Sequence, residues 1–78
     1  MLKKFIEQNG RQFELRFNVI DEGTMYKVHL LSGKSELRDF VMTANEARDR
    51  HLNADRVIFD YLSQEAEKEI KAGQIELP

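Results

Sequence analysis

One stretch of the chain, residues 53–73, constrains the fold more than any other. Its apolar residues recur at the three- and four-residue spacing of a helix, while its charged residues fall mostly on the opposite side. The apolar set is Val57, Ile58, Tyr61, Leu62, Ala66 and Ile70. Such a stripe must be buried, and the comparable apolar surface elsewhere is the alternating segment 13–19 and its neighbours. The sequence therefore predicts a sheet covered on one face by this helix.

The length of the chain sets the scale of the core. We expect a chain of 78 residues to form one domain, residues 1–78. This length is near the lower limit for folding on an apolar core without disulfides or a structural metal. A hydrophobic content of 41% with 33% charged residues is typical of a globular protein and argues against disorder. Since the sequence has no cysteine, it excludes a disulfide framework and a thiolate zinc site.

The charge is small and unevenly placed. Residues 1–42 contain seven Lys/Arg and six Asp/Glu, whereas residues 43–78 contain five and eight, which gives +1 and −3. This distribution does not form the basic footprint that nucleic-acid backbones select. No apolar run of signal-peptide length follows Lys3 and Lys4, and no run is long enough to span a bilayer. We therefore expect a cytoplasmic protein without a membrane partner.

Asn9-Gly10 is the strongest hairpin signal, because both residues tolerate positive φ. It joins the alternating segments Lys3–Gln8 and Arg11–Ile20. A two-residue loop would pair Ile6 with Phe13, and a three-residue loop would pair Phe5 with Phe13. We expect the three-residue loop, since it places Phe5 on the core face with Phe13 and its alternating neighbours Leu15, Phe17 and Val19.

Two further strands continue the pattern. A turn at residues 21–24 leads to residues 25–31, and an even-length loop puts Tyr26, Val28 and Leu30 on the core face. A second turn at residues 32–35 precedes a strand over residues 36–42, in which we expect Phe40 and Met42 to face inward. The competing register would bury Asp39, which is costly without a partner.

The helical half begins with a capping-box pattern, in which Thr43 precedes Glu46 by three residues. A helix running unbroken to Ala72 would be about 43 Å long, whereas eight-residue strands span about 27 Å. We expect a break near Leu52, with Asn53 as a new N-cap; an overhanging helix that meets a partner is the alternative. Gly73 is placed to end the long helix. Beyond it, Ile75 and Leu77 are expected to tuck against the sheet edge or to fray.

Together these features predict an α+β domain. Four antiparallel strands form a meander in the order 1-2-3-4, and a short helix followed by a longer C-terminal helix packs on one face of the sheet.

Motifs for catalysis and cofactors do not withstand inspection. Ser32-Gly33-Lys34-Ser35 resembles the end of a phosphate-binding loop, but Val28 stands where that pattern requires glycine. His51 and Asp55 share a helical face only if the helix is continuous, and with His29 they leave a metal site short of ligands. No serine has a local pattern that would activate its hydroxyl. We expect no enzyme, cofactor or metal, unless a site exists that the sequence does not expose.

The face of the sheet that one helix leaves bare is the expected functional surface. Its candidate contact residues are Ile6, Arg16, Ile20, Lys27, His29, Leu31, Leu37 and Val41. Apolar residues on this face, a thin core and open sheet edges favour burial by a second copy or by another protein. A single-stranded nucleic acid bound through Arg16, Lys27, Lys34 and Arg38 is the alternative. The face mixes Glu14 with Arg16 and presents no aromatic ring in the expected registers, so a homodimer is the first hypothesis.

Overall fold

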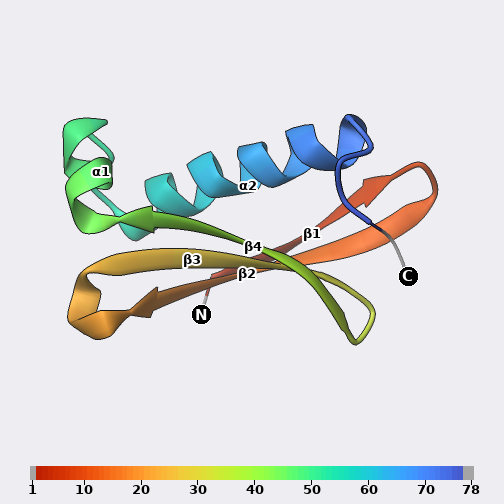
Figure 1. Cartoon of the computed structure of the whole chain (residues 1–78), viewed down its shortest axis with the longest axis horizontal. Helices are drawn as coiled ribbons and strands as arrows, with labels where there is room; N and C mark the ends of the chain where they lie inside the picture. The colour runs from red at the N-terminus through yellow and green to blue at the C-terminus, as the bar shows by residue number, and fades with distance from the viewer. Residues whose placement is uncertain (1, 77–78) are drawn as a thin grey trace.

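Four antiparallel strands follow one another both along the chain and across the sheet, and two helices lie on one face of that sheet (Figure 1). The structure is a computed structural model that describes residues 2–76. Its elements are β1 (Lys3–Gln8), β2 (Arg11–Ile20), a 3-10 turn η1 (Asp21–Gly23), β3 (Met25–Ser32), β4 (Ser35–Thr43), α1 (Ala44–Asp49) and α2 (Asp55–Lys71). This arrangement confirms the predicted α+β meander with a short and a long helix. Within residues 2–76, neither helix combines the length and the apolarity that crossing a bilayer requires.

The first hairpin has a two-residue loop, so the predicted three-residue loop is wrong. Asn9 and Gly10 have φ values of 55° and 76°, and Ile6 pairs with Phe13. Two consecutive residues at positive φ form the turn whose twist matches that of the flanking strands, and this turn geometry outweighs the preference of an aromatic ring for the core. Phe5 consequently lies on the uncovered face with 55% of its surface exposed. Ile6 packs against the core, and its predicted place on the uncovered face is wrong.

The second hairpin has the predicted even-length loop, and the predicted residues of β4 face inward. Ile20 pairs with Met25, which confirms the even loop over residues 21–24. Phe40 and Met42 are buried as predicted. In β4, however, one extra residue is inserted where the register shifts between Leu30 and Leu31. This bulge disrupts the alternation at Leu37, which is half-buried and packs against the core, so its predicted exposure on the uncovered face is wrong.

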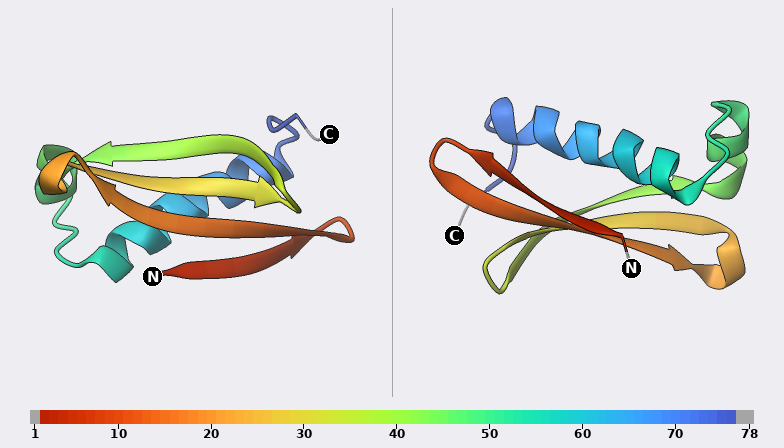
Figure 2. Two further views of the ribbon diagram at one scale, coloured as in Figure 1. Left: turned by 90° about the horizontal axis from the view of Figure 1, so that it is seen from below. Right: turned by 180° about the vertical axis from the view of Figure 1, so that it is seen from behind.

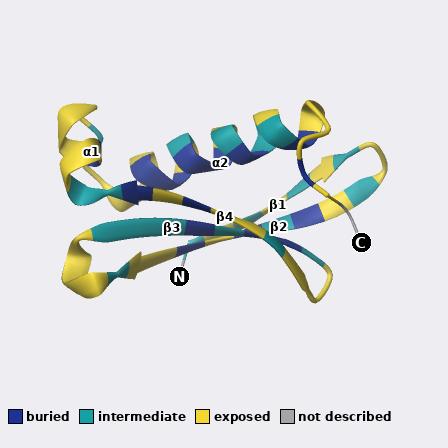
Figure 3. Ribbon diagram, viewed as in Figure 1, coloured by how far each residue is buried: buried dark blue, intermediate teal, exposed yellow. Residues whose placement is uncertain are grey.

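The core lies between the sheet and α2, as the sequence predicts. Phe13, Leu15 and Phe17 of β2 are buried in one cluster with Ile58 and Leu62 of α2. Figure 3 shows buried segments both in the sheet and along α2. α2 crosses the strands diagonally (Figure 2), which lets one helix contact residues of several strands. Packing against the sheet, and not the intrinsic helix propensity of the segment, therefore determines which face of α2 is buried.

Two valines predicted to be buried are exposed. Val57 is 44% exposed. Phe59, on the other flank of the apolar stripe, is 1% exposed, and its ring centre lies 5.8 Å from that of Phe17. Val19 is 46% exposed, although its pairing with Tyr26 puts it on the helix side. It lies beside Asp55, the first residue of α2, where the cover provided by that helix ends.

The helix break is confirmed, but the N-cap of α2 is Ala54 and not Asn53. Thr43 and Glu46 form the predicted capping box at the start of α1. At its end, His51 adopts a φ of 59° and the Leu52 N–H donates to the Ala47 carbonyl. Because the Leu52 N–H is used in this C-terminal cap, Leu52 cannot start the next helix. Two further residues separate it from Asp55, where α2 begins.

The C-terminus of α2 has the predicted glycine cap. Gly73 has a φ of 71°, and the N–H groups of Gly73 and Gln74 donate to the carbonyls of Ile70 and Glu69. These two bonds define a Schellman motif. The turn directs Ile75 back into the core, where it is buried, whereas Leu77 lies outside the described residues.

Candidate functional site: the open face of the sheet

The surface of the sheet opposite the helices, here called the open face, is built from rows of paired residues. Directly opposed residues of antiparallel strands have their side chains on the same side. One row contains Lys3, Arg16, His29 and Asp39, and its neighbours contain Phe5, Glu14 and Leu31 on one side and Asn18, Lys27 and Val41 on the other. A further row at the end of the sheet contains Ile20, Met25 and Thr43.

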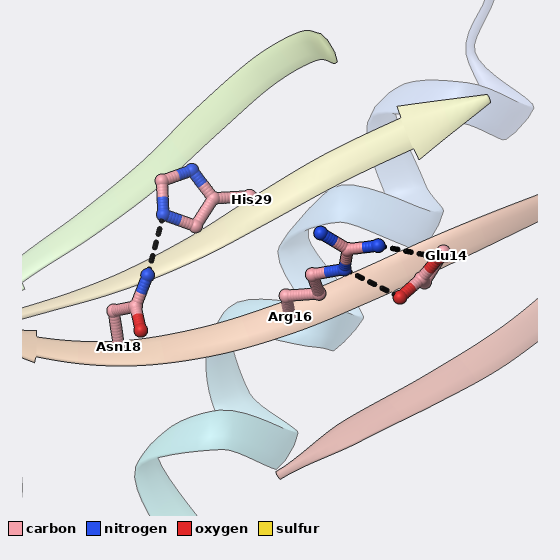
Figure 4. A network of polar contacts seen from close by, with 4 residues as sticks. All are labelled: Glu14, Arg16, Asn18 and His29. Carbon is pink, nitrogen blue, oxygen red and sulfur yellow. Dashed lines mark hydrogen bonds and ion pairs between the residues drawn. The ribbon is translucent and has the colours of Figure 1, made fainter. Parts of the chain in front are cut away.

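Arg16 and Glu14 form a two-pronged ion pair on this face (Figure 4). Arg16 Nε lies 2.5 Å from Glu14 Oε2, and Nη2 lies 3.3 Å from Oε1. The hydrogen bonds from Arg16 lower the pKa of the Glu14 carboxyl, and the nearby charges of Arg16 and Lys3 act in the same direction. Glu14 in turn raises the pKa of Arg16, mainly by hydrogen bonding. Both groups therefore remain charged near neutral pH and compensate one another.

A second polar chain connects three strands. Asn18 Nδ2 lies 2.9 Å from His29 Nε2, and His29 Nδ1 lies 2.8 Å from Asp39 Oδ1. Because an amide nitrogen only donates, this arrangement requires an imidazole that accepts at Nε2 and donates from Nδ1 to the carboxylate. Lys27 Nζ lies 3.7 Å from the other Asp39 oxygen. Asp39 therefore lies on the open face with two partners. The free-energy cost of burying an unpaired carboxylate, which the competing register would have carried, is avoided.

Apolar side chains flank this polar centre. Val41 is 53% exposed, and it belongs to the row next to Ile20 and Met25, which are half-buried. Phe5 belongs to the row on the other side, in which Glu14 separates it from the buried Leu31. The Lys3 ammonium lies 6.0 Å from the centre of the Phe5 ring. The open face therefore combines a charge-compensated centre with exposed apolar groups on both sides.

Six of the eight predicted contact residues lie on this face: Arg16, Ile20, Lys27, His29, Leu31 and Val41. Ile6 and Leu37 do not. Phe5 was predicted to lie on the opposite face. Met25 and Asp39 lie on the open face, as the predicted registers require, but they were not among the predicted contact residues. The tolerance of Asn9-Gly10 for positive φ at both positions was the signal that would have placed Phe5 correctly.

The cations proposed for nucleic-acid binding are not on one surface. Arg16 and Lys27 lie on the open face, but Arg38 lies on the helix side, where it forms an ion pair with Glu69 of α2. Lys34 lies in the turn between β3 and β4. The structure thus separates the four residues that this alternative requires to act together.

Within residues 2–76, no cluster of three or more His, Asp or Glu side chains is arranged to hold a metal ion. No protein-family model, curated protein or solved structure matches this chain. The open face is therefore interpreted from its own chemistry.

Proposed function

We propose that the chain is a non-enzymatic protein-interaction module that binds a second copy of itself through the open face. The observation that carries the proposal is the combination of exposed apolar groups, Phe5 and Val41, with ion pairs that are already closed within one copy. Helices cover only the other side of the sheet, so a flat partner has access to this one.

The closed ion pairs favour a protein surface over a polyanion. Burying a lone charge costs several kcal/mol, whereas a charge that keeps its partner and its hydrogen bonds loses less on leaving water. Arg16 keeps its ion pair with Glu14 when the face is buried, and Lys27 keeps its ion pair with Asp39. A phosphate backbone would instead need these cations to be free of carboxylates.

The charge pattern is self-complementary. In the row that contains Lys3, Arg16, His29 and Asp39, a cation stands on the β1 edge and an anion on the β4 edge. When two sheets pack face to face about a two-fold axis parallel to their strands, β1 of one copy lies over β4 of the other. Lys3 then faces Asp39 of the second copy, and the same contact forms twice.

The size of the face predicts a modest affinity. Four strands spaced by about 4.8 Å and eight residues long make a surface of about 19 by 27 Å. Two copies would bury on the order of 1,000 Å² in total, which is near the lower limit for a specific interface. We therefore expect a dimer with a dissociation constant in the micromolar range rather than a permanent complex.

Light scattering over a series of protein concentrations tests the proposal. The mass should rise from one copy to two as the concentration passes from low to high micromolar. Val41→Lys should shift this transition at least tenfold upward in concentration, because it places a charge in the interface. Val57→Lys is the matched control, since Val57 is also an exposed valine but lies on α2. A constant monomer mass, or equal effects of both variants, would refute the open-face dimer.

One observation favours single-stranded nucleic acid as a second candidate. Phe5 is an exposed ring beside Lys3 and opposite Glu14, and aromatic rings next to cations are platforms on which bases stack. Electrophoretic mobility of labelled oligonucleotides distinguishes the two candidates. Salt-sensitive binding that is lost in Phe5→Ala would support this candidate, and the absence of binding at low salt would remove it.

A further inference from the structure

The outer edge of β4 has backbone groups available for another strand. The Ala44 N–H donates to the Thr24 carbonyl at 2.8 Å, and such pairs alternate along an antiparallel ladder. Phe40 and Met42 therefore bond to β3, while the backbone groups of Asp39 and Val41 point away from the sheet. In the part of the chain that the structure describes, β4 is the last strand of the sheet, so these groups face no further strand.

A hollow of about 400 Å³ lies beside this edge, on the helix side of β4. Four apolar residues line it: Phe40, Met42 and Leu62, which belong to the core, and the exposed Val41. The first helix contributes Glu46 and its C-cap residue Arg50 to the walls of the hollow. The second helix, α2, contributes Tyr61, Glu65 and Glu69. The volume falls within the range of about 300 to 1,000 Å³ that is typical of ligand sites. An apolar side chain that enters it would extend the existing core.

The charge around the hollow is negative. On the helix side its lining contains two guanidinium groups, Arg38 and Arg50, against three carboxylates, Glu46, Glu65 and Glu69, so the formal net charge is −1. Asp39 also lines the hollow, but its carboxylate pairs with His29 and Lys27 on the open face. Both arginines are engaged inside the chain. Arg38 pairs with Glu69, and Arg50 donates to the Tyr61 hydroxyl at 2.9 Å while its guanidinium lies 5.3 Å from the ring centre. Glu46 pairs with neither arginine, and the exposed Lys68 lies 3.9 Å from Glu65. An incoming cation would therefore meet Glu46 and compete with Lys68 for Glu65.

We propose that this site binds an extended peptide segment of another protein, in which Lys or Arg lies two positions before and two positions after a large apolar residue. The segment adds to β4 as a fifth strand and bonds to the backbone of Asp39 and Val41. Since alternate side chains of a strand point to the same side, every second residue of the segment faces α2 and one apolar side chain enters the hollow. The basic residues face the carboxylates along its walls.

The probe for a test is a labelled nine-residue peptide that has a central phenylalanine, one lysine two positions before it, one lysine two positions after it, and threonine at the other positions, so that the lysines and the phenylalanine face the same side. Its control has glutamate in place of each lysine. Fluorescence anisotropy should show that the lysine peptide binds to the full chain at least tenfold more tightly than the glutamate peptide. Equal binding of the two peptides would refute the charge argument.

Two pairs of variants locate the site. Val41→Pro removes an outward N–H at a sheet edge, where proline is tolerated, and should weaken binding at least tenfold. Glu7→Pro is its control. The hydrogen bond from Phe17 to Leu2 shows that the Glu7 N–H points to the outer edge of β1 and is also free of a partner strand there.

A second pair tests the charge of the hollow. Glu65→Lys should also weaken binding, whereas Glu67→Lys, on the same helix but outside the lining, should leave it unchanged.

The outcomes also separate this site from the open-face dimer. Glu65→Lys lies on the helix side and should alter peptide binding without altering the mass of the chain. Amide hydrogen exchange at Asp39 and Val41 should slow when the lysine peptide is added. The proposal is overturned if Val41→Pro and Glu65→Lys leave peptide binding unchanged. It is also overturned if Val41→Pro abolishes self-association while the intact chain binds no peptide, since β4 would then pair with a second copy.

Discussion

At the scale of single residues, the Arg16–Glu14 pair defines the chemistry of the open face. The two side chains meet through two hydrogen bonds and cancel each other's charge on a surface that also exposes Phe5. A pair of this kind on the surface contributes little to stability. In the proposed dimer, this pair would present a neutral centre rather than a free cation to the second copy.

The pKa of Glu14 reports this pair directly. Because its folded-state pKa lies below the ordinary value of 4.5, the pair stabilises the fold above that pH. This contribution is lost as the pH falls through the folded-state pKa. In a carbon-13 NMR titration, Arg16→Ala should move the Glu14 pKa upward toward 4.5. Lys27→Ala, which removes a cation paired with Asp39 instead, should leave it in place; equal shifts in both variants would contradict the assignment.

Most of the candidate face follows from the sequence, and its errors have local causes. Arg16, Lys27 and His29 were placed correctly because the strict alternation of β2 and β3 leaves only one face for them. Ile6 and Phe5 exchanged faces because a difference of one residue in the loop reverses every side chain of β1. Burial of the aromatic ring was the wrong criterion for choosing between the two loops.

At the scale of elements, helix α2 shows what a pattern alone leaves undecided. Ile58, Leu62 and Ala66 form the middle of its stripe, which can be widened toward either flank. One flank has Val57 and Tyr61, and the other has Phe59 and Ser63. The first is the more apolar in sequence, yet the second is buried, because Phe59 packs against Phe17 across the interface. Tertiary packing therefore decided the rotation of the helix.

The ends of the two helices differ in a way that stability measurements detect. Gly73 and His51 occupy equivalent left-handed positions with φ values of 71° and 59°. Gly73→Ala should destabilise the fold by about 1 kcal/mol, and the cause is the backbone, since no described atom lies within 4 Å of an added Cβ. His51→Gly should stabilise it by up to about 1 kcal/mol. Urea denaturation measures both, and effects of the same sign would contradict the cap assignment.

At the scale of the whole molecule, we propose partners for two surfaces of the fold. The open face is broad and charge-compensated, which fits a second copy of the chain. The β4 edge is narrow, backbone-rich and acidic, which fits an extended basic peptide. The hollow lies on the helix side of the sheet and the proposed dimer surface on the other side, and the two proposals share Asp39 and Val41 of β4. The meander produces this division, since helices that follow the last strand cover only one face.

The most direct test of the open-face dimer is a charge exchange measured by sedimentation equilibrium. Lys3→Glu and Asp39→Lys should each weaken the dimer several-fold, because each opposes like charges across the two-fold axis. The double variant should recover most of the lost affinity, while Lys34→Glu, in a turn away from the face, should have no effect. A double variant that is weaker than either single variant, or a wild-type chain that stays monomeric at every concentration, would contradict the account.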